Sequence, residues 1–300
     1  MHMIDDAAIA KAREEYERDG ATVMRQVLSP EQVEVLGRAV DHIMQPGSAE
    51  PDFVNGENLS NEGGRFFNSN FAYRRNADLQ DLVFRSDLGR IAGEMMQSSQ
   101  VRFFYDQILV KEPGTADRTP WHQDLPYYPI DGEHVISFWV ALDRATPENG
   151  VVTYVKGSHR WNRFFSMQAF SDKYRESSER ERSLPVYDDA EARGQPRNLA
   201  DIRDHPENYE FLSWSVEPGD ILVHHPLTIH GSSGNSSTGM RRRAIATRWL
   251  GDDARWNDTR PNFMRALKGR KGFEMPPLEL GDKLDVPLFP LVWSREGASA

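Results

Sequence analysis

The spacing of apolar residues divides the chain into a mainly helical first part and a strand-rich remainder. In the stretch that begins at Ser29, Pro30 stands at the first helical position and Gln32 where a capping box needs it. Apolar residues then recur at roughly helical spacing, so this stretch predicts a helix. A later apolar stretch predicts another helix, capped by Ser86. We therefore expect residues 1–100 to be mainly helical.

After residue 100 the pattern changes to short β-branched and aromatic runs, separated by Gly, Pro and Asn, which is typical of strands. These runs follow one another without the regular alternation with helices that a Rossmann-like sheet requires. Antiparallel strands in sequence favour a sandwich or jelly roll. We therefore predict an all-β core with flanking helices (α+β), whose strands come from residues 101–114, 134–143, 150–160, 219–232 and 241–253.

Two long stretches lack this apolar periodicity. Residues 46–70 are rich in Gly, Asn and Ser, and residues 162–210 are rich in charged residues and Ser. Both predict long loops. Because long loops in a compact domain are often functional, both are candidates for a lid over a binding site.

Composition narrows the class of protein and the chemistry open to it. The net charge of −10 argues against nucleic acid or an anionic membrane as a general partner, because both attract positive surfaces. The chain has no cysteine, so a metal would have to be held by His, Asp or Glu. We see neither a secretory signal nor an apolar run long enough to cross a bilayer, and we therefore predict a cytoplasmic protein.

Candidate metal ligands stand in the stretch "WHQDLPYY", where His122 and Asp124 are two residues apart. Side chains at i and i+2 of a strand share one face, so we expect these two to converge. A third ligand has to come from elsewhere, and His224, His225 and His230 are candidates. His230 ends a strand before a Gly/Ser turn, whereas we interpret the other two as structural. Two histidines and one carboxylate with open positions suit a non-haem Fe(II) oxygenase.

Several stretches resemble the phytanoyl-CoA dioxygenase family of Fe(II)/2-oxoglutarate oxygenases, from about residue 101 to residue 249. They are "WHQDLPYY", "ALDRATPENG", "VVTYVKGSHR" and "GDILVHHPLTIHGSSGNSS", followed by "RRRAIATRW". The N-terminal "YERDGATVMRQVLSPEQ" also resembles the helix–strand–helix of that family. The resemblance implies a double-stranded β-helix, a cupin-like jelly roll. We expect one domain over residues 1–300, with a helical part at about 1–100, a core at about 101–250 and a C-terminal extension at 251–300.

The resemblance also implies a reaction. Fe(II) is expected on His122, Asp124 and His230, with 2-oxoglutarate and O2 as co-substrates and no catalytic residue beyond the metal ligands. The implied reaction hydroxylates an unactivated C–H bond of a small organic molecule and releases succinate and CO2. Related halogenases have a small residue in place of the carboxylate, so the presence of Asp124 favours hydroxylation. Two alternatives stay open: a non-catalytic cupin-like binding module for small molecules, and a Zn-dependent isomerase or hydrolase.

Two residues are candidates for the arginine that is expected to bind 2-oxoglutarate. In the family it follows the distal histidine by about eleven residues, which admits Arg241 or Arg242. The far carboxylate of 2-oxoglutarate favours the fork geometry of a guanidinium, and neighbouring inward side chains must be small. Ala244 and Ala246 share the strand face of Arg242, whereas Arg241 shares its face with Arg243. We therefore predict Arg242, with Arg241 as the alternative.

Four further residues are predicted near the site. The resemblance implies that Lys111 and Trp139 also contact 2-oxoglutarate. Gln107 shares a strand face with Lys111, and we predict that it contacts co-substrate or substrate. Arg248 has the parity of Arg242 and should point inward, where a buried arginine needs a partner. It is predicted to bind substrate, with half of a structural ion pair as the open alternative.

Overall fold

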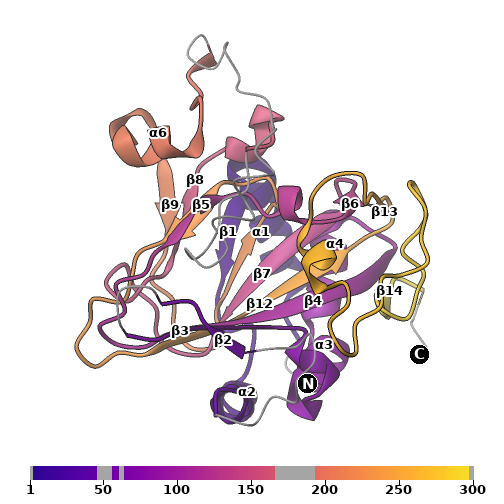
Figure 1. The fold of residues 1–300 in the computed structure, drawn as a ribbon, viewed down its shortest axis with the longest axis horizontal. Coiled ribbons are helices and arrows are strands. Elements are labelled where there is room, and N and C mark those ends of the chain that lie inside the picture. The colour runs from indigo at the N-terminus through magenta and orange to yellow at the C-terminus, as the bar shows by residue number, and fades with distance from the viewer. Residues whose placement is uncertain (1–2, 46–55, 61–63, 166–192, 297–300) are drawn as a thin grey trace.

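The computed structural model of the protein describes residues 3–45, 56–60, 64–165 and 193–296. Helices dominate the first hundred residues, as predicted, although three strands also lie there (Figure 1). The α-helices are α1 (Asp6–Asp19), α2 (Pro30–Ile43), α3 (Ala77–Arg85), α4 (Leu88–Met96) and α6 (Leu199–Asp204). The 3-10 helices are η1 (Ala72–Arg74), η2 (Leu125–Tyr127), η3 (Ser158–Trp161), η6 (Pro206–Asn208) and η7 (Phe263–Leu267).

The larger sheet is antiparallel and runs in the order β1-β10-β7-β12-β4-β3-β2, with β14 also paired to β4. Strands from both ends of the chain therefore join one sheet. Its members are β1 (Ala21–Met24), β2 (Gly56–Asn58), β3 (Phe66–Asn70), β4 (Gln100–Lys111), β7 (Val135–Ala141), β10 (Ile221–His224), β12 (Arg242–Leu250) and β14 (Leu291–Ser294).

A smaller antiparallel sheet lies opposite and runs in the order β5-β11-β8-β9. Apolar side chains of both sheets form one buried cluster, in which Trp139 and Ala246 of the larger sheet meet Tyr154 of the smaller. The predicted β core with flanking helices is thus confirmed as two facing sheets. The strands of the smaller sheet are β5 (Thr119–His122), β8 (Val152–Val155), β9 (Phe211–Ser213) and β11 (His230–Ser232), and β6 (Ile130–Asp131) pairs separately with β13 (Arg255–Trp256).

Strand β7 shows why an almost entirely apolar run becomes a central strand. It lies between β10 and β12, and all of its residues are buried. Phe138 and Val140 join the core that also contains helical residues such as Ile91 of α4. Trp139 and Ala141 point to the other face, between the two sheets. A strand covered on both faces needs apolar residues at nearly every position, and this one has them.

The predicted cap of α2 is confirmed, and that of α4 is wrong by one residue. Ser29 accepts a hydrogen bond from the backbone N–H of Gln32, whose side chain accepts one from the backbone N–H of Ser29. In α4 the cap position is Asp87. Ser86 ends α3, and its hydroxyl donates to the carbonyl of Leu82 in that helix and also accepts from the backbone N–H of Leu88, the first residue of α4.

The two predicted loops are partly wrong. Residues 56–58 and 66–70 are strands β2 and β3, and residues 199–204 form helix α6. The Asn- and Ser-rich β3 is a strand because its backbone pairs with β4, which supplies hydrogen bonds that its composition does not indicate. The remainder of each predicted lid includes residues 46–55, 61–63 and 166–192, which lie outside the described residues.

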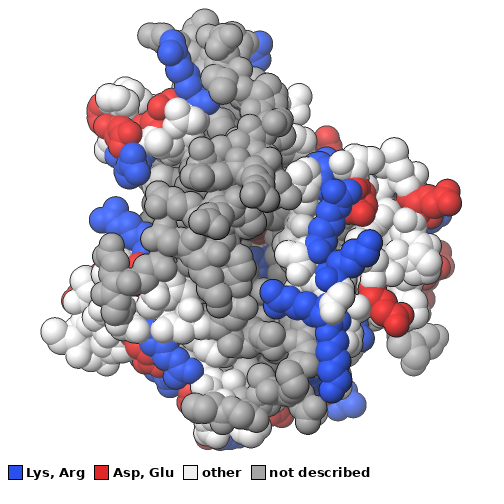
Figure 2. All heavy atoms as spheres, viewed as in Figure 1, with Lys and Arg blue, Asp and Glu red and all other residues white. Residues whose placement is uncertain are grey.

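The surface charge is uneven although the net charge is −10. Figure 2 shows Lys and Arg side chains in a row on the right-hand part of one face, where Figure 1 draws the chain that follows β13. This chain has no acidic residue over positions 260–271, which contain Arg260, Arg265, Lys268, Arg270 and Lys271. A basic area of this kind can attract small anions despite the overall charge.

No helix among the described residues combines the length and apolarity that crossing a bilayer requires.

Candidate active site

Two histidines and one aspartate that are far apart in the sequence come together between the sheets. His122 ends β5 and His230 begins β11, and the two are direct partners across these paired strands. Asp124 Oδ1 lies 3.7 Å from His122 Nε2 and 3.8 Å from His230 Nε2. The three residues are buried, and one ligand atom from each lies within 4.8 Å of the others. The structure therefore brings together all three predicted metal ligands, and we call them the His–Asp–His group.

The reason for this convergence differs from the one expected. Strand β5 ends at His122, and Asp124 has helical backbone angles (φ −76°, ψ −46°) at the start of η2. The chain turns here because the backbone N–H groups of Asp124 and Leu125 both donate to the carbonyl of Pro226, at 2.8 and 3.0 Å. A turn, not the two-residue period of a strand, thus aims the carboxylate at the histidines. Gln123 is buried and donates to the carbonyl of Leu227, among other contacts.

Both histidines present the same ring nitrogen to the centre of the group. His122 Nδ1 lies 2.8 Å from the carbonyl of Pro120, and His230 Nδ1 lies 2.9 Å from that of Thr228. A carbonyl can only accept, so each Nδ1 carries the proton and each Nε2 is the unprotonated nitrogen that can bind a metal. Burial lowers the pKa of His122 to about 3 and that of His230 to about 4. Neutral imidazoles with inward Nε2 atoms are suited to bind a metal.

This donor set fits ferrous iron. Two imidazole nitrogens and one carboxylate oxygen, with open positions, are the ligands of non-haem Fe(II) oxygenases. Among the described residues the metal-binding group contains no fourth His, Asp or Glu. His224 is nearby, with its ring 4.5 Å from that of His230, but its Nε2 contacts the other oxygen of Asp124.

The second oxygen of Asp124, Oδ2, has protein partners of its own. Ser137 Oγ donates to it at 2.8 Å, and His224 Nε2 lies 3.3 Å and Arg248 Nε 3.8 Å away. Burial alone would raise the pKa of Asp124, but Arg248 and the hydrogen bond from His224 hold it well below its ordinary value. The sequence analysis did not single out Ser137 and treated His224 as merely structural. Ser137 has the strand parity of Trp139, which is the signal that could have placed it inside.

A pair of buried cations, Lys111 and Arg242, lies across two neighbouring strands, β4 and β12. We call it the basic pair. Lys111 is 0% and Arg242 2% exposed. Lys111 Nζ donates to Ser232 Oγ at 2.9 Å, and Arg242 Nη1 donates to the carbonyl of Leu109 at 3.0 Å. No Asp or Glu in the described part of the chain forms a salt bridge with either, although the charges of Asp117 and Asp143 act on Lys111 and Arg242 respectively. Buried cations without a salt-bridge partner favour an anionic ligand.

The surroundings of the basic pair agree with that interpretation. Burial lowers the pKa of Arg242 to about 10, and burial together with the neighbouring Arg242 lowers the pKa of Lys111 well below its ordinary value. The Arg242 guanidinium carbon lies 5.6 Å from the centre of the Trp139 ring. Ala244 and Ala246 are buried on the same side, between the sheets, as expected from their small size. An anion here would meet two desolvated cations beside an aromatic wall.

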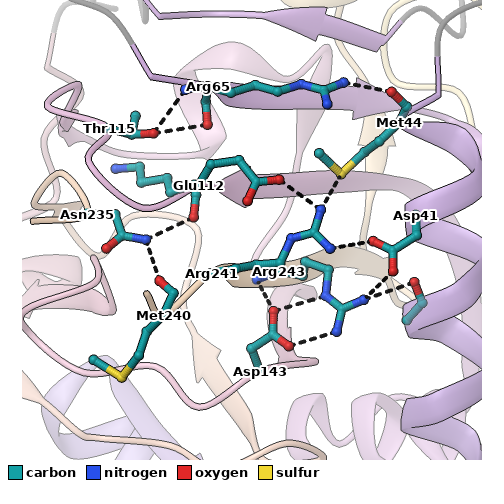
Figure 3. Close-up of polar contacts among 12 residues, drawn as sticks. Asp41, Met44, Arg65, Glu112, Thr115, Asp143, Asn235, Met240, Arg241 and Arg243 are labelled. Carbon is teal, nitrogen blue, oxygen red and sulfur yellow. Dashed lines mark hydrogen bonds and ion pairs between the residues drawn. The ribbon is translucent and has the colours of Figure 1, made fainter. Parts of the chain in front are cut away.

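The two arginines that flank Arg242 make different contacts (Figure 3). Arg241 forms ion pairs with Asp41 at 2.7 Å and Glu112 at 2.8 Å. Arg243 forms one with Asp41 at 2.9 Å and donates twice to Asp143, at 3.0 and 2.8 Å. These pairs tie helix α2 to β12. Of the three adjacent arginines, the middle one forms no salt bridge with a carboxylate of the described residues.

Gln107 and Arg248, the predicted substrate contacts, touch each other. Arg248 Nη2 donates to Gln107 Oε1 at 2.9 Å, and Arg248 Nε donates to the hydroxyl of Tyr128 at 3.1 Å. Gln107 Nε2 in turn donates to Asn68 Oδ1 at 2.7 Å. Arg248 lies beside Asp124 of the His–Asp–His group, and Gln107 is held next to Arg248, so both residues have protein partners already in place. Their assignment to substrate stays a prediction.

Comparison with known proteins identifies the family. The sequence matches the phytanoyl-CoA dioxygenase (PhyH) family over residues 16–244. The chain belongs to this family. The family predicted from the quoted stretches is therefore confirmed, and the match covers both the His–Asp–His group and the basic pair.

Relatives of this PhyH-family chain include the peroxisomal phytanoyl-CoA dioxygenase of Homo sapiens, 24% identical over 171 residues, which are 56% of this chain and 44% of that protein. The chain thus spans less than half the length of this relative. The multifunctional dioxygenase prhA of Penicillium brasilianum is 25% identical over 240 residues, 77% of this chain and 68% of that protein. Among solved structures, the non-heme alpha ketoglutarate dependent carbocyclase SnoK from nogalamycin biosynthesis superposes with a TM-score of 0.71 at 22% identity. That match covers 98% of this chain and 100% of SnoK, and it confirms the fold class.

Proposed function

We propose that this PhyH-family protein is an Fe(II)- and 2-oxoglutarate-dependent dioxygenase that hydroxylates an unactivated C–H bond of a small organic molecule, with release of succinate and CO2. The observation that carries the proposal is the juxtaposition of the His–Asp–His group with the unpaired basic pair. Three protein ligands leave positions open on the metal for co-substrate and dioxygen. The basic pair offers two positive charges to a dicarboxylate.

The proposed metal ligands are His122 and His230 through Nε2 and Asp124 through Oδ1. Carbonyl groups fix both imidazoles in the tautomer that leaves Nε2 unprotonated, and burial keeps the rings neutral. When bound, Fe(II) and 2-oxoglutarate supply the oxidising chemistry, which converts the co-substrate to succinate and CO2 and leaves oxygen for the substrate. The role of the protein is to hold these groups in a buried site, from which bulk water is excluded.

The proposed 2-oxoglutarate contacts are Arg242, Lys111 and Trp139. The guanidinium of Arg242 can bind the far carboxylate through two N–H groups, which an ammonium cannot do in the same plane. Lys111 adds a second positive charge, and its bonds to Ser232 and Ser233 hold the ammonium in place. A bound dianion would supply a direct salt-bridge partner, which neither Lys111 nor Arg242 has among the described residues, so the protein should bind 2-oxoglutarate much more tightly than an uncharged analogue.

The outcome at the substrate is proposed as hydroxylation because the carboxylate ligand, Asp124, is present. The relatives show that other outcomes are found on this fold, since one is named a multifunctional dioxygenase and another a carbocyclase. Gln107 and Arg248 remain the proposed residues nearest to a substrate. Desaturation or ring chemistry would still require the same metal and co-substrate.

The test measures succinate formed from 2-oxoglutarate by the purified protein with candidate small molecules, with and without added Fe(II) and O2. We expect succinate only when both are present, and none from an Asp124→Ala variant. Calorimetry under anaerobic conditions, with Ni(II) in place of Fe(II), should show 2-oxoglutarate binding without any substrate. Turnover with Zn(II) and no 2-oxoglutarate would instead indicate an isomerase or hydrolase. Ligand binding without metal or 2-oxoglutarate binding would indicate a binding module.

A further inference from the structure

Three side chains from three neighbouring strands converge on the Oδ2 atom of Asp124. Ser137 comes from β7, His224 from β10 and Arg248 from β12, at 2.8, 3.3 and 3.8 Å respectively. All are buried: Ser137 is 0%, His224 3% and Arg248 5% exposed. None of them belongs to the His–Asp–His group. The oxygen opposite to the proposed metal-binding oxygen is therefore enclosed by donors.

The hydrogen-bond chemistry of His224 agrees with a donor role. Its Nδ1 lies 3.4 Å from the hydroxyl of Tyr154, which can donate to it, and its Nε2 faces Asp124 Oδ2. With Nδ1 accepting, the ring proton sits on Nε2 and points at the carboxylate. His224 therefore acts as a neutral donor to the ligand carboxylate and does not offer a free lone pair to a metal.

The partners of Arg248 explain why it is buried at all. In addition to its ion pair with Asp124, the guanidinium donates hydrogen bonds to Tyr128, Gln107 and the carbonyl of Ala246. Among the described residues, Asp124 is the one carboxylate within salt-bridge range of it. Arg248 thus has a countercharge inside the protein, in contrast to Arg242 of the basic pair. This contact favours the ion-pair alternative for Arg248, and its assignment to substrate stays a prediction.

We propose that Ser137, His224 and Arg248 are positioning residues that keep Asp124 a one-oxygen ligand, and so keep three positions of an octahedral metal open. This inference rests on the proposed function. A carboxylate can bind a metal through one oxygen or through both, and two-oxygen binding would occupy a fourth position. Turning Oδ2 toward the metal would break its bonds to Ser137 and His224 and move it away from Arg248. In a buried site, water is not available to replace those lost hydrogen bonds.

The main test compares Ser137→Ala with Ser69→Ala. Ser137→Ala removes one hydroxyl from Asp124 and changes little else. Ser69 is a matched control, because it is also buried, at 1% exposure on β3, and its hydroxyl has no hydrogen-bond partner among the described residues. The measurements are the dissociation constant for Co(II), the visible spectrum of the Co(II)-loaded protein, and the affinity of that protein for 2-oxoglutarate. Removing partners that orient a metal ligand typically weakens metal binding roughly 10- to 100-fold.

We expect Ser137→Ala to weaken Co(II) binding by about 10-fold, to change the Co(II) spectrum, and to weaken 2-oxoglutarate binding, while Ser69→Ala matches the wild type. Arg248→Gln should have the larger effect, and Arg248→Lys should restore part of it because the positive charge is kept. That rescue separates positioning of the carboxylate from general loss of packing. If Arg248→Gln does not fold, Ser137→Ala decides alone.

Two different failures can be told apart. If the wild type binds Co(II) and 2-oxoglutarate but Ser137→Ala behaves like Ser69→Ala in all three measurements, the positioning proposal is overturned and the proposed function stands. If the wild type binds neither ligand, the proposed function itself fails. If Arg248→Lys and Arg248→Gln change the Co(II) spectrum to the same extent, the role proposed for the charge of Arg248 is contradicted.

Discussion

Replacing Arg242 by glutamine separates the two candidate anchors for 2-oxoglutarate. The matched variant is Arg241→Gln, one position earlier on the chain. Arg242 is buried without a carboxylate partner among the described residues, whereas Arg241 pairs with Asp41 and Glu112 on the outer side of the sheet. The two substitutions remove the same chemical group from opposite environments. We therefore expect Arg242→Gln to weaken 2-oxoglutarate binding without lowering stability, and Arg241→Gln to lower stability without weakening binding.

The size of the binding effect follows from burial. Removing one partner of a buried, hydrogen-bonded charge pair costs about 2–5 kcal/mol. Since about 1.36 kcal/mol corresponds to a factor of ten, the expected loss of affinity is roughly 30-fold to several thousand-fold. Lys111 keeps one positive charge next to the ligand, so we expect Arg242→Gln to lie near the lower part of this range, at about 100-fold. Arg241→Gln should change the affinity by less than about 3-fold, because the contacts of Arg241 are surface ion pairs with Asp41 and Glu112.

The two substitutions should also differ in their effect on the melting temperature of the ligand-free protein. Burial lowers the pKa of Arg242 to about 10, which means that the folded state disfavours its charged form when no anion is bound. Arg242→Gln should therefore leave the melting temperature of the ligand-free protein unchanged or higher. Arg241→Gln removes two half-buried ion pairs and should lower it slightly.

Calorimetry of the Ni(II)-loaded variants with 2-oxoglutarate, together with thermal melts in its absence, measures both effects. The reasoning is refuted if Arg242→Gln binds 2-oxoglutarate like the wild type while Arg241→Gln loses affinity. It is also refuted if Arg242→Gln loses affinity only because the ligand-free protein is already unfolded at the assay temperature.

Three further predictions concern the fold. Asp41→Asn breaks both ion pairs that join α2 to β12, and because Asp41 is 44% exposed at its side chain we expect a loss of only about 1 kcal/mol, visible as a drop of roughly 2–4 °C in thermal melting. Gly93→Ala should cost about 1–3 kcal/mol in urea unfolding, since a Cβ there would lie 2.2 Å from the ring of Trp293, and a variant as stable as the wild type would contradict this packing. Burial raises the pKa of Asp106 to about 7, although the backbone N–H groups of Tyr73 and Ala72 and the charge of Arg248 act against it. The folded protein then holds a proton that the unfolded chain releases near pH 4, so the free energy of unfolding should fall by up to about 4 kcal/mol between pH 4 and 7. Asp106→Asn should flatten that slope in urea unfolding measured at several pH values, whereas an unchanged slope would assign it to other groups.

Features that depend on near neighbours in the chain could be predicted from the sequence. The capping box of α2 needs only Ser29 and Gln32, three residues apart, and it forms as expected. The apolar run of β7 predicts a strand because alternate side chains must cover both faces of a central strand. The three residues of the His–Asp–His group were also predictable, since a His-x-Asp stretch and a later strand-end histidine form a recognisable pattern. In each case the signal lies within a few positions or in the type of side chain.

Features that depend on distant partners required the tertiary structure. Strand β3 has the composition of a loop, and it is a strand because β4 lies beside it. Arg241 and Arg242 are adjacent and chemically identical, and what separates them is Asp41, which is 200 residues from Arg241 in the sequence. His224 and Asp124 are 100 residues apart, so no local pattern shows that one orients the other.

The sequence by itself therefore determined elements such as α2 and β7 and the side chains that can bind a metal and a dicarboxylate, because propensity, periodicity and ligand chemistry are local properties. Only the tertiary structure decided which arginine stays unpaired, why Asp124 turns toward the histidines, and which residues enclose its second oxygen. Those outcomes depend on which buried charges find partners when strands from both halves of the chain meet, and the cost of burying a charge without a partner makes that pairing decisive.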